Sequence, residues 1–283
     1  MSLKVNICGI EFDNPVIAAS GTFGFGKEFA DYIDINKLGG ISSKGLTLHK
    51  NLGNKGIRIY ETAAGIMNSI GLQNPGIEYF IKEELPFLET KDAVTIANLG
   101  GHSVDEYVKG AILLDKTSVP IIELNISCPN VKEGGMAFGT NPKKACEVIE
   151  KVRKATKKVL MVKLSPNVGD IKEFVKIAEN SGADCISLVN TFNALAIDVD
   201  NKKAVFENKT AGLSGPCIKP IALRMVYEAS NATNLPIIGM GGISNYRDCL
   251  EFIMAGASAV QVGTSNFVDF NTMINIVDDL EKY

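Results

Sequence analysis

The sequence has 283 residues, of which 46% are hydrophobic, and its formal net charge is −3. This composition is typical of a folded domain and excludes a disordered chain. The small negative charge argues against a nucleic-acid-binding surface. No stretch approaches the roughly 20 apolar residues that a membrane span needs, and the N-terminal residues lack the pattern of a signal peptide. We therefore expect a cytoplasmic protein that binds neither nucleic acid nor membrane.

The cysteines are scattered and include no C-x-x-C pair. This spacing argues against a zinc site or an iron–sulfur cluster held by this chain, so we expect no metal. Most of the thiols are expected to be small buried side chains in a reducing compartment. The six positions are Cys8, Cys128, Cys146, Cys185, Cys217 and Cys249.

Short, almost continuously apolar runs recur along the chain and alternate with helical patterns. Such runs are typical of parallel strands that are covered on both faces. We predict eight strands, at residues 15–19, 40–44, 94–99, 121–127, 160–164, 186–190, 236–240 and 259–263.

Residues with helix-capping side chains precede several of the helical patterns. The predicted N-caps are Ser103, Asn141, Asp170 and Ser244. Ser103 is followed at the spacing of a capping box by Glu106, and a first-turn proline follows Asn141. These signals place a helix after four of the predicted strands.

Eight strand–helix units in one chain predict an α/β fold, a (β/α)8 TIM barrel formed by a single domain over residues 1–283. The alternative is an open doubly wound sheet, which is less favoured because no G-x-G-x-x-G follows the first strand. Residues 3–12 are expected to form an N-terminal hairpin that closes the barrel bottom. Residues 46–92 are glycine-rich and are expected to be an inserted region between strands 2 and 3, with a short ribbon or helix over the barrel mouth.

Glycines follow the last two predicted strands. In this barrel type the active site lies at the C-terminal ends of the strands, and the last two loops often bind phosphate. Gly241 and Gly242 follow strand 7, and Gly263 and Thr264 follow strand 8. Glycine allows backbone N–H groups to approach a phosphate, and a helix that starts at Ser244 would favour an anion. Ordinary turn glycines are the alternative, but the agreement of both loops favours a phosphate site.

Two lysines, Lys44 and Lys163, lie at strand ends in otherwise apolar surroundings. Each is either paired with a barrel carboxylate or directed at an anionic ligand. Glu123 is the one acidic residue near a strand end, and its position indicates a structural pairing deeper in the barrel. We therefore favour ligand contact, and a flavin suits it because a fixed ammonium group stabilises the negative charge of the reduced ring.

Four asparagines are predicted at the same mouth: Asn68, Asn98, Asn125 and Asn190. An amide side chain both donates and accepts hydrogen bonds, which matches the alternating N–H and C=O groups of a pyrimidine or a flavin edge. One such asparagine is usually a turn residue. Four of them that converge on one barrel mouth favour a ligand site.

Cys128 is the candidate acid–base residue. A thiolate near Lys44 would have a lowered pKa and could remove a carbon-bound proton. The alternative, an inert buried thiol, is less favoured because a glycine-rich segment at 132–139 follows and could close over a ligand. His49 and His102 have no carboxylate at a suggestive spacing, so a histidine-based triad is not expected.

Four segments, taken together and in order, resemble class 1 dihydroorotate dehydrogenases, and the resemblance covers essentially the whole chain. They are Ser-Gly-Thr-Phe-Gly-Phe-Gly at 20–26, Asn-Ser-Ile-Gly-Leu-Gln-Asn-Pro-Gly at 68–76, Asn-Ile-Ser-Cys-Pro-Asn at 125–130 and Gly-Met-Gly-Gly-Ile at 239–243. The loop after Cys128 is similar to that of class 1B catalytic subunits and differs from the Pro-Gly-Lys-Pro-like loop of fumarate-using class 1A enzymes. Class 2 enzymes use serine as the base and carry an N-terminal membrane-associated extension.

The resemblance implies a role for each matching residue. The residues implied to hold FMN are Ser20, Lys44, Gly45, Asn98, Asn125, Lys163, Val189, Gly215, Gly241, Gly242, Gly263 and Thr264. The residues implied to contact substrate are Lys44, Asn68, Ser69, Ile70, Gly71, Leu72, Asn125, Asn190 and Thr191. Val189, Gly215 and the 68–72 loop rest on the resemblance alone.

The resemblance also implies the reaction. Cys128, with Lys44 beside it, would remove the proton from C5 of (S)-dihydroorotate while the hydride from C6 passes to N5 of FMN. The product would be orotate, for pyrimidine biosynthesis. Electrons would then pass to a partner subunit that carries FAD and a [2Fe–2S] cluster, and on to NAD, within a heterotetramer built on a homodimer of this chain.

Other functions are compatible with parts of the pattern. A class 1A-like enzyme would pass electrons to fumarate, and a flavin reductase would act on another pyrimidine, such as uracil or a tRNA uridine. A flavoprotein that only relays electrons would not need Cys128. A phosphate-sugar barrel enzyme would contain no flavin.

Overall fold

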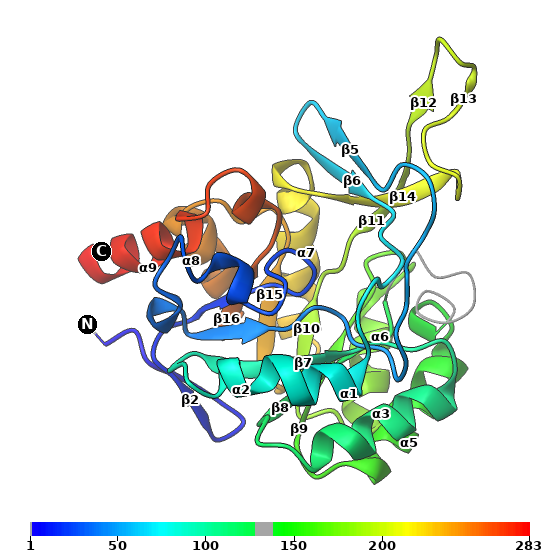
Figure 1. Cartoon of the computed structure of the whole chain (residues 1–283). Helices are drawn as coiled ribbons and strands as arrows, with labels where there is room; N and C mark the ends of the chain where they lie inside the picture. Colours follow the sequence, from blue (N-terminus) through cyan, green and yellow to red (C-terminus); the bar gives the residue numbers. More distant parts are fainter. Residues whose placement is uncertain (1, 128–137) are drawn as a thin grey trace.

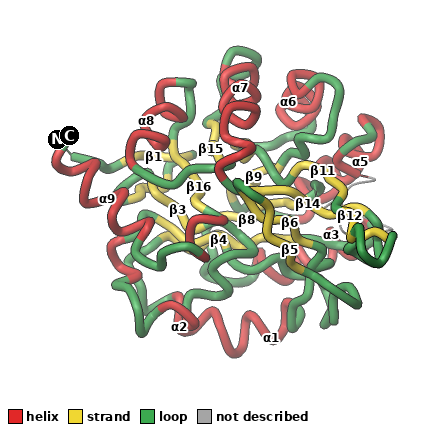
Figure 2. The backbone as a smooth tube through the Cα atoms, turned by 90° about the horizontal axis from the view of Figure 1, so that it is seen from above, coloured by secondary structure: helices red, strands yellow, loops and turns green. Residues whose placement is uncertain are grey.

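The computed structural model describes residues 2–127 and 138–283, and a closed barrel of parallel strands forms its centre (Figures 1 and 2). The strands follow one another around the barrel in chain order, so each crossover joins neighbours. All eight predicted runs form barrel strands, which confirms the barrel and excludes the open sheet. The strands are β3 (Val16–Ala18), β4 (Gly40–Ser42), β7 (Val94–Leu99), β8 (Ile121–Asn125), β9 (Val159–Lys163), β10 (Cys185–Leu188), β15 (Ile237–Met240) and β16 (Ala259–Val262).

Helices surround the barrel, as the view from above shows (Figure 2). Their buried apolar residues share one core cluster with those of the barrel strands. Short 3-10 turns η1 (Lys27–Phe29) and η2 (Ile35–Lys37) stand where a first helix would be. No helix among the described residues is both long and apolar enough to cross a membrane. The outer helices are α3 (Val104–Asp115), α5 (Pro142–Ala155), α6 (Ile171–Asn180), α7 (Lys219–Ser230), α8 (Tyr246–Met254) and α9 (Thr272–Lys282), with 3-10 turns η4 (Pro216–Ile218) before α7 and η5 (Thr264–Phe267) after β16.

Three of the four predicted helix caps are confirmed. The side chains of Ser103, Asn141 and Asp170 each accept a hydrogen bond from a backbone N–H in the first turn of the helix that follows. The fourth prediction, Ser244, is wrong by one residue. Asn245 caps α8, because its Oδ1 accepts from the N–H groups of Arg247 and Asp248.

The predicted hairpin lies at the barrel bottom. Strands β1 (Val5–Ile7) and β2 (Ile10–Phe12) pair antiparallel. Ile7 and Phe12 are fully buried in a cluster with the first residues of the barrel strands, including Ile121 and Ile238. The barrel interior at this end is therefore closed by apolar packing.

The inserted region between β4 and β7 contains both a ribbon and a helix. Strands β5 (Ile59–Thr62) and β6 (Gly65–Asn68) form the ribbon, and the helical part comprises α1 (Ile77–Tyr79), η3 (Phe80–Glu84) and α2 (Leu85–Leu88). The η3 segment is a π-helical turn. Pro86 follows it and lacks the N–H that a regular α-helix would use there, which accounts for the wider turn.

A second segment, which was not expected from the sequence, completes the sheet above the barrel. Strands β11 (Phe192–Leu195) and β14 (Thr210–Ser214) join the ribbon in the order β11-β14-β6-β5. A small ribbon of β12 (Ile197–Asp198) and β13 (Lys203–Ala204) extends from it. Figure 1 shows this sheet standing on the side of the barrel opposite the hairpin. The loops after β4 and β10 together therefore build one wall over the barrel mouth.

Replacing Phe12 with alanine is expected to lower the free energy of unfolding by about 3–5 kcal/mol. The reason is the cavity that it leaves in the apolar cluster, or plug, which the hairpin forms with the barrel strands at the barrel bottom. Phe12→Leu, which keeps most of the volume, should cost much less. Urea titration of both variants beside the wild type measures the difference. Equal stability of Phe12→Ala and wild type would contradict a packed plug.

Candidate functional site

A cavity of about 310 Å³ opens at the C-terminal ends of the barrel strands. Its size is in the range of small-ligand sites. The inserted ribbon and the ends of the barrel strands both contribute residues to its lining. The predicted residues that line it are Ser20, Lys44, Gly45, Asn68, Ile70, Gly71, Leu72, Asn125, Lys163, Val189, Asn190, Thr191, Gly215, Gly241, Gly242, Gly263 and Thr264.

Two of the predicted site residues that the structure describes are not part of this lining. Asn98 is fully buried behind Asn125. Ser69 is also buried, and its Oγ accepts hydrogen bonds from the side chains of Asn54 and Asn208. Both lie behind the cavity wall, and their predicted ligand contacts stay predictions. Cys128 lies outside the described residues.

The lining also contains residues that were not predicted from the sequence. They come from the barrel strands and the loops that follow them, and from the upper sheet and its loops. Gln261 interrupts the apolar run of β16, and this interruption was the available signal. The missed residues are Ala19, Gly21, Thr22, Ile59, Ile66, Gln73, Ser214, Ile218, Met240, Gln261 and Phe267.

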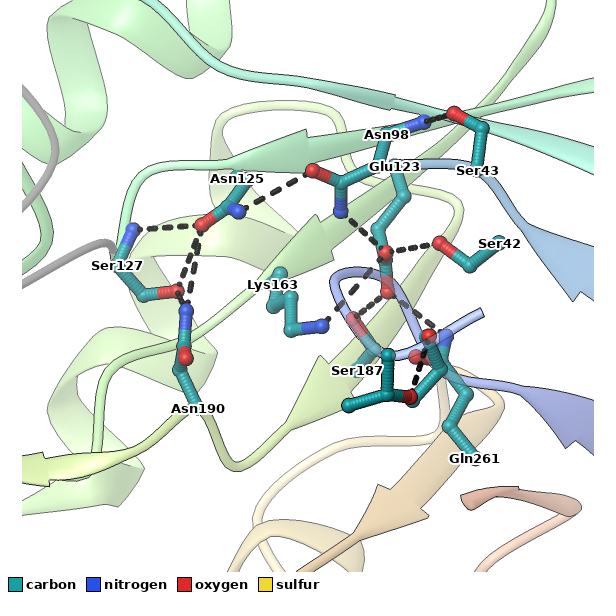
Figure 3. A network of polar contacts seen from close by, with 12 residues as sticks. Ser42, Ser43, Asn98, Glu123, Asn125, Ser127, Lys163, Ser187, Asn190 and Gln261 are labelled. Atoms are coloured by element: carbon teal, nitrogen blue, oxygen red, sulfur yellow. Dashed lines mark hydrogen bonds and ion pairs between the residues drawn. The ribbon is translucent and has the colours of Figure 1, made fainter. Parts of the chain in front are cut away.

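A buried carboxylate, Glu123, lies beneath the cavity and collects hydrogen bonds from several strands (Figure 3). Its Oε2 accepts from Ser42 Oγ at 2.7 Å and from Asn98 Nδ2 at 2.5 Å. Its Oε1 accepts from Ser187 Oγ at 2.7 Å and from Gln261 Nε2 at 2.8 Å. The expected structural role of Glu123 within the barrel agrees with this geometry.

Lys163 is both a cavity residue and the cationic neighbour of Glu123. Its Nζ lies 3.8 Å from Glu123 Oε2, and both side chains are almost completely buried. Burial opposes the charge of Glu123, but the Lys163 ammonium and the hydrogen bonds from Ser42, Ser187 and Asn98 outweigh it and lower the pKa of this carboxyl. The two alternatives posed for Lys163, carboxylate pairing and a position in the ligand site, therefore coexist.

The amide side chains at the mouth form a connected chain (Figure 3). Asn125 Nδ2 donates to Asn98 Oδ1 at 3.2 Å, and Asn125 Oδ1 accepts from Ser127 Oγ at 3.0 Å. Asn190 Nδ2 donates to Ser127 Oγ at 2.8 Å. Ionised Glu123 can only accept hydrogen bonds, so the NH2 group of Asn98 must point toward it and the Asn98 oxygen toward Asn125. This in turn orients the NH2 group of Asn125 toward Asn98. The polar edge that meets a ligand is thus fixed from below.

Lys44 is half-buried at the cavity and makes no ion pair with any residue in the described ranges. Burial lowers the pKa of Lys44; the negative charge of Glu28 opposes this shift and the positive charge of Arg58 adds to it. A cation that is held without a protein partner is suited to bind an anionic group. This is the role that the sequence predicts for Lys44.

Five cavity glycines have backbone conformations that other residues rarely adopt, and three of them lie in the loops after β14 and β15. The φ angles of Gly215, Gly241 and Gly242 are 102°, 127° and 78°. A Cβ atom at Gly242 would lie 2.8 Å from the carbonyl oxygen of Gly215, so the two loops are in close contact. Gly263 differs, because its backbone is not in this region and a Cβ there would meet only ordinary contacts. The loops after β15 and β14 thus form a tight glycine cradle at one end of the cavity.

The structure gives the position of Ser244, which the sequence predicts at the start of a helix that favours an anion. Ser244 is absent from the cavity lining, and its Oγ donates to Asp248 Oδ2 at 2.8 Å. Gly215 instead precedes η4, which leads directly into α7. Asp248 also accepts from Lys219 Nζ at 2.7 Å, which ties the start of α7 to the first turn of α8.

Comparisons with known proteins point to one family. The sequence profile of dihydroorotate dehydrogenase matches residues 2–283. A protein of Petrotoga mobilis named dihydroorotate dehydrogenase B (NAD(+)), catalytic subunit, is 62% identical over 280 residues, which are 99% of this chain and 93% of that protein. Proteins with the same name from Thermoanaerobacter pseudethanolicus and Bacteroides thetaiotaomicron are 53% and 50% identical, over 100% and 99% of this chain and 94% and 93% of their own lengths.

Lys44→Met is expected to raise the melting temperature of the ligand-free protein at pH 7. The pKa of Lys44 is lower in the folded state than in the unfolded state. At a pH below both of these pKa values, the charged lysine therefore destabilises the fold. This cost disappears as the pH rises through the lowered pKa toward the ordinary value of 10.5, and the difference between variant and wild type should shrink there. Thermal unfolding at pH 7 and pH 9.5 tests this. A variant that melts lower at pH 7 would contradict it.

Glu123→Gln is expected to lower the free energy of unfolding by about 3–5 kcal/mol at pH 7, because it leaves the Lys163 ammonium buried without a counter-charge. Folding lowers the pKa of Glu123, so the ionised carboxylate adds to the free energy of unfolding at a pH above its ordinary pKa of 4.5. This contribution is lost as the pH falls through the folded-state pKa. The deficit of the variant should therefore narrow on acidification. Urea titrations across this range measure it, with Ser42→Ala as a milder control that removes one donor only.

Proposed function

The chain belongs to the dihydroorotate dehydrogenase family, and we propose that it is the FMN-binding catalytic subunit of an NAD-linked enzyme that oxidises (S)-dihydroorotate to orotate. The observation that carries this proposal is the convergence of two lysines, three asparagines and the glycine cradle on one cavity. The printed names of the relatives describe the same kind of subunit. The reaction belongs to pyrimidine biosynthesis, and we place it in the cytoplasm.

The residues of the cavity fit FMN. The glycine cradle presents backbone without side chains at one end of the cavity, which is the kind of surface that a phosphate can approach closely. Lys163 places a positive charge near the strand ends, and a buried side-chain oxygen of Gln261 has no partner within the described residues. When bound, FMN would supply the acceptor of the two electrons that leave the substrate. The residues proposed to hold it are Ser20, Lys44, Gly45, Asn125, Lys163, Val189, Gly215, Gly241, Gly242, Gly263 and Thr264, with Asn98 positioning Asn125.

The substrate is proposed to bind against the amide chain and the inserted ribbon. Dihydroorotate has a carboxylate and a ring edge of alternating N–H and C=O groups. Lys44 would bind the anionic group, and the amides of Asn68, Asn125 and Asn190 would match the ring edge. Thr191 and the backbone of 70–72 complete this side, while Ser69 supports the loop from behind.

Cys128 is proposed as the base that removes the proton from C5. This assignment rests on the sequence motif, since Cys128 lies outside the described residues. The positive charge of Lys44 would favour both a thiolate and the negative charge that develops on the substrate. We therefore assign Lys44 to catalysis as well as to binding.

The names of the relatives also support a partner subunit. Each is called a catalytic subunit of an enzyme that uses NAD(+). We propose that a separate subunit with FAD and a [2Fe–2S] cluster takes the electrons, and that two copies of this chain form the core of a heterotetramer. Robust NAD reduction by the purified chain alone would contradict this, and fumarate reduction would favour a class 1A-like enzyme.

Anaerobic addition of dihydroorotate to the FMN-loaded chain is expected to bleach the visible flavin bands. Cys128→Ser should slow this bleaching at neutral pH by about 100-fold or more, since the hydroxyl is a far weaker base. Stopped-flow absorbance measures both rates, and Cys146→Ser, on the outer helix α5, is the matched control that should bleach at the wild-type rate.

Other outcomes would reject the proposal or one of its parts. A chain that takes up no flavin would favour the phosphate-sugar alternative. Flavin that remains oxidised with dihydroorotate but is reduced by another dihydropyrimidine would favour the alternative of a flavin reductase that acts on another pyrimidine. Unchanged bleaching in Cys128→Ser would remove the cysteine from the mechanism.

A further inference from the structure

A buried asparagine, Asn74, uses its whole hydrogen-bonding capacity behind the cavity wall. Its side chain is only 4% exposed and is not part of the cavity lining. Its Oδ1 accepts from the backbone N–H groups of Thr47 at 3.1 Å and Gly76 at 2.8 Å. Its Nδ2 donates to Thr47 Oγ1 at 2.8 Å and to the carbonyl oxygen of Leu72 at 2.7 Å. A side-chain amide has two donor and two acceptor positions, so all four are satisfied by the protein.

The two segments that Asn74 joins both carry residues of the cavity. Thr47 follows Lys44 by three residues, and Lys44 and Leu72 both line the cavity. Backbone hydrogen bonds between Asn51 and Asn74, one in each direction at 2.9 and 3.0 Å, connect the same two segments. Asn74 therefore ties the chain that follows Lys44 to the loop that contains Leu72, from outside the cavity.

Leu72 has a backbone conformation that leucine rarely adopts, with a φ angle of 55°. Such a conformation persists only where the surrounding structure holds it. The carbonyl oxygen of Leu72 is held by Asn74 Nδ2, and that of Gly71 accepts from Asn51 Nδ2 at 3.2 Å.

The conformation of Leu72 also fixes where its side chain lies. A Cβ atom at Gly45 would be 2.9 Å from Leu72 Cδ2, so the leucine side chain packs directly on the residue that follows Lys44. A leucine that relaxed to an ordinary backbone conformation would move this side chain and the adjoining part of the cavity wall. The bond from Asn74 opposes that relaxation.

We propose that Asn74 is a positioning residue for substrate binding: it holds Leu72 in its strained conformation and so keeps the 70–72 loop in place beside Lys44. This inference rests on the proposed function, which places the substrate against that loop. Asn74 acts through Leu72 and does not contact the ligand itself. Most residues proposed to hold FMN belong to other strand ends, so the loss of Asn74 should weaken substrate binding much more than FMN binding.

Asn74→Ala tests the proposal by comparing two affinities. FMN-loaded protein is titrated with orotate by the shift in flavin absorbance, and apoprotein is titrated with FMN by flavin fluorescence. We expect orotate to bind about tenfold more weakly than to the wild type, the effect of losing one buried hydrogen bond, and the affinity for FMN to change by less than about twofold. Unchanged orotate affinity, or an equal loss of affinity for both ligands, would overturn the proposal.

Asn14→Ala is the matched control for the loss of a buried asparagine. Asn14 is 5% exposed, its Oδ1 accepts from the N–H groups of Val16 and Gly39, and its Nδ2 donates to the carbonyl oxygen of Lys37. It joins two chain segments as Asn74 does, but at the N-terminal ends of β3 and β4. This variant should melt at a lower temperature than the wild type and bind orotate with wild-type affinity. An equal loss of orotate affinity in both variants would reduce Asn74 to a stabilising residue.

Asn74→Ser is the second variant and is used if Asn74→Ala does not fold. Serine forms the same kind of turn as asparagine, so it can keep the bond from the N–H of Gly76. It has no amide NH2 group for the carbonyl oxygen of Leu72, and the same selective loss of orotate affinity is expected. Wild-type orotate affinity in this variant would contradict the role of Asn74.

The two proposals fail in different ways. A wild-type chain that binds neither FMN nor orotate refutes the proposed function and this inference with it. A wild-type chain that binds both, with orotate affinity unchanged in the Asn74 variants, refutes the inference alone.

Discussion

The structure of the site depends on one buried negative charge, that of Glu123. Removing a carboxylate from water is costly unless donors and a counter-charge surround it, and here they come from five other barrel strands. Those donors lie at the C-terminal half of the barrel, directly under the cavity, so the groups that stabilise the barrel interior also orient the ligand site. The neighbours are Ser42 on β4, Asn98 on β7, Lys163 on β9, Ser187 on β10 and Gln261 on β16.

The cavity residues divide into those that the protein satisfies and those that it leaves for a ligand. Asn98 and Asn125 are paired with other side chains and hold their positions without a ligand. Lys44 makes no ion pair with any residue in the described ranges. Its unpaired charge reduces the stability of the ligand-free chain, and a ligand that pairs with it restores this stability, since binding to the folded state alone stabilises that state.

The sequence predicts the barrel well because its signals are local. Eight apolar runs and three helix caps are enough to predict the fold, because a parallel strand that is covered on both faces is recognisable from its own apolar sequence. The sheet above the barrel is only half predicted. In β11, half-buried and exposed residues alternate, and β14 pairs with β6 more than 140 residues earlier in the chain, as in the pair Gly212 and Asn68. A pairing so distant in sequence leaves no trace in either segment alone.

The limits of the site prediction have the same cause. A strand end identifies which residues lie near the mouth but not which way each side chain points. The sequence predicts Asn98 in the ligand site, and the structure shows its amide donating to Glu123 beneath the cavity; Gln261 has no such signal because it lies within a strand and not at its end. One carboxylate explains both cases, since it accepts from Asn98 and Gln261 alike. Side-chain direction at this mouth is thus decided by a buried charge that the sequence marks only as an acidic residue in an apolar run.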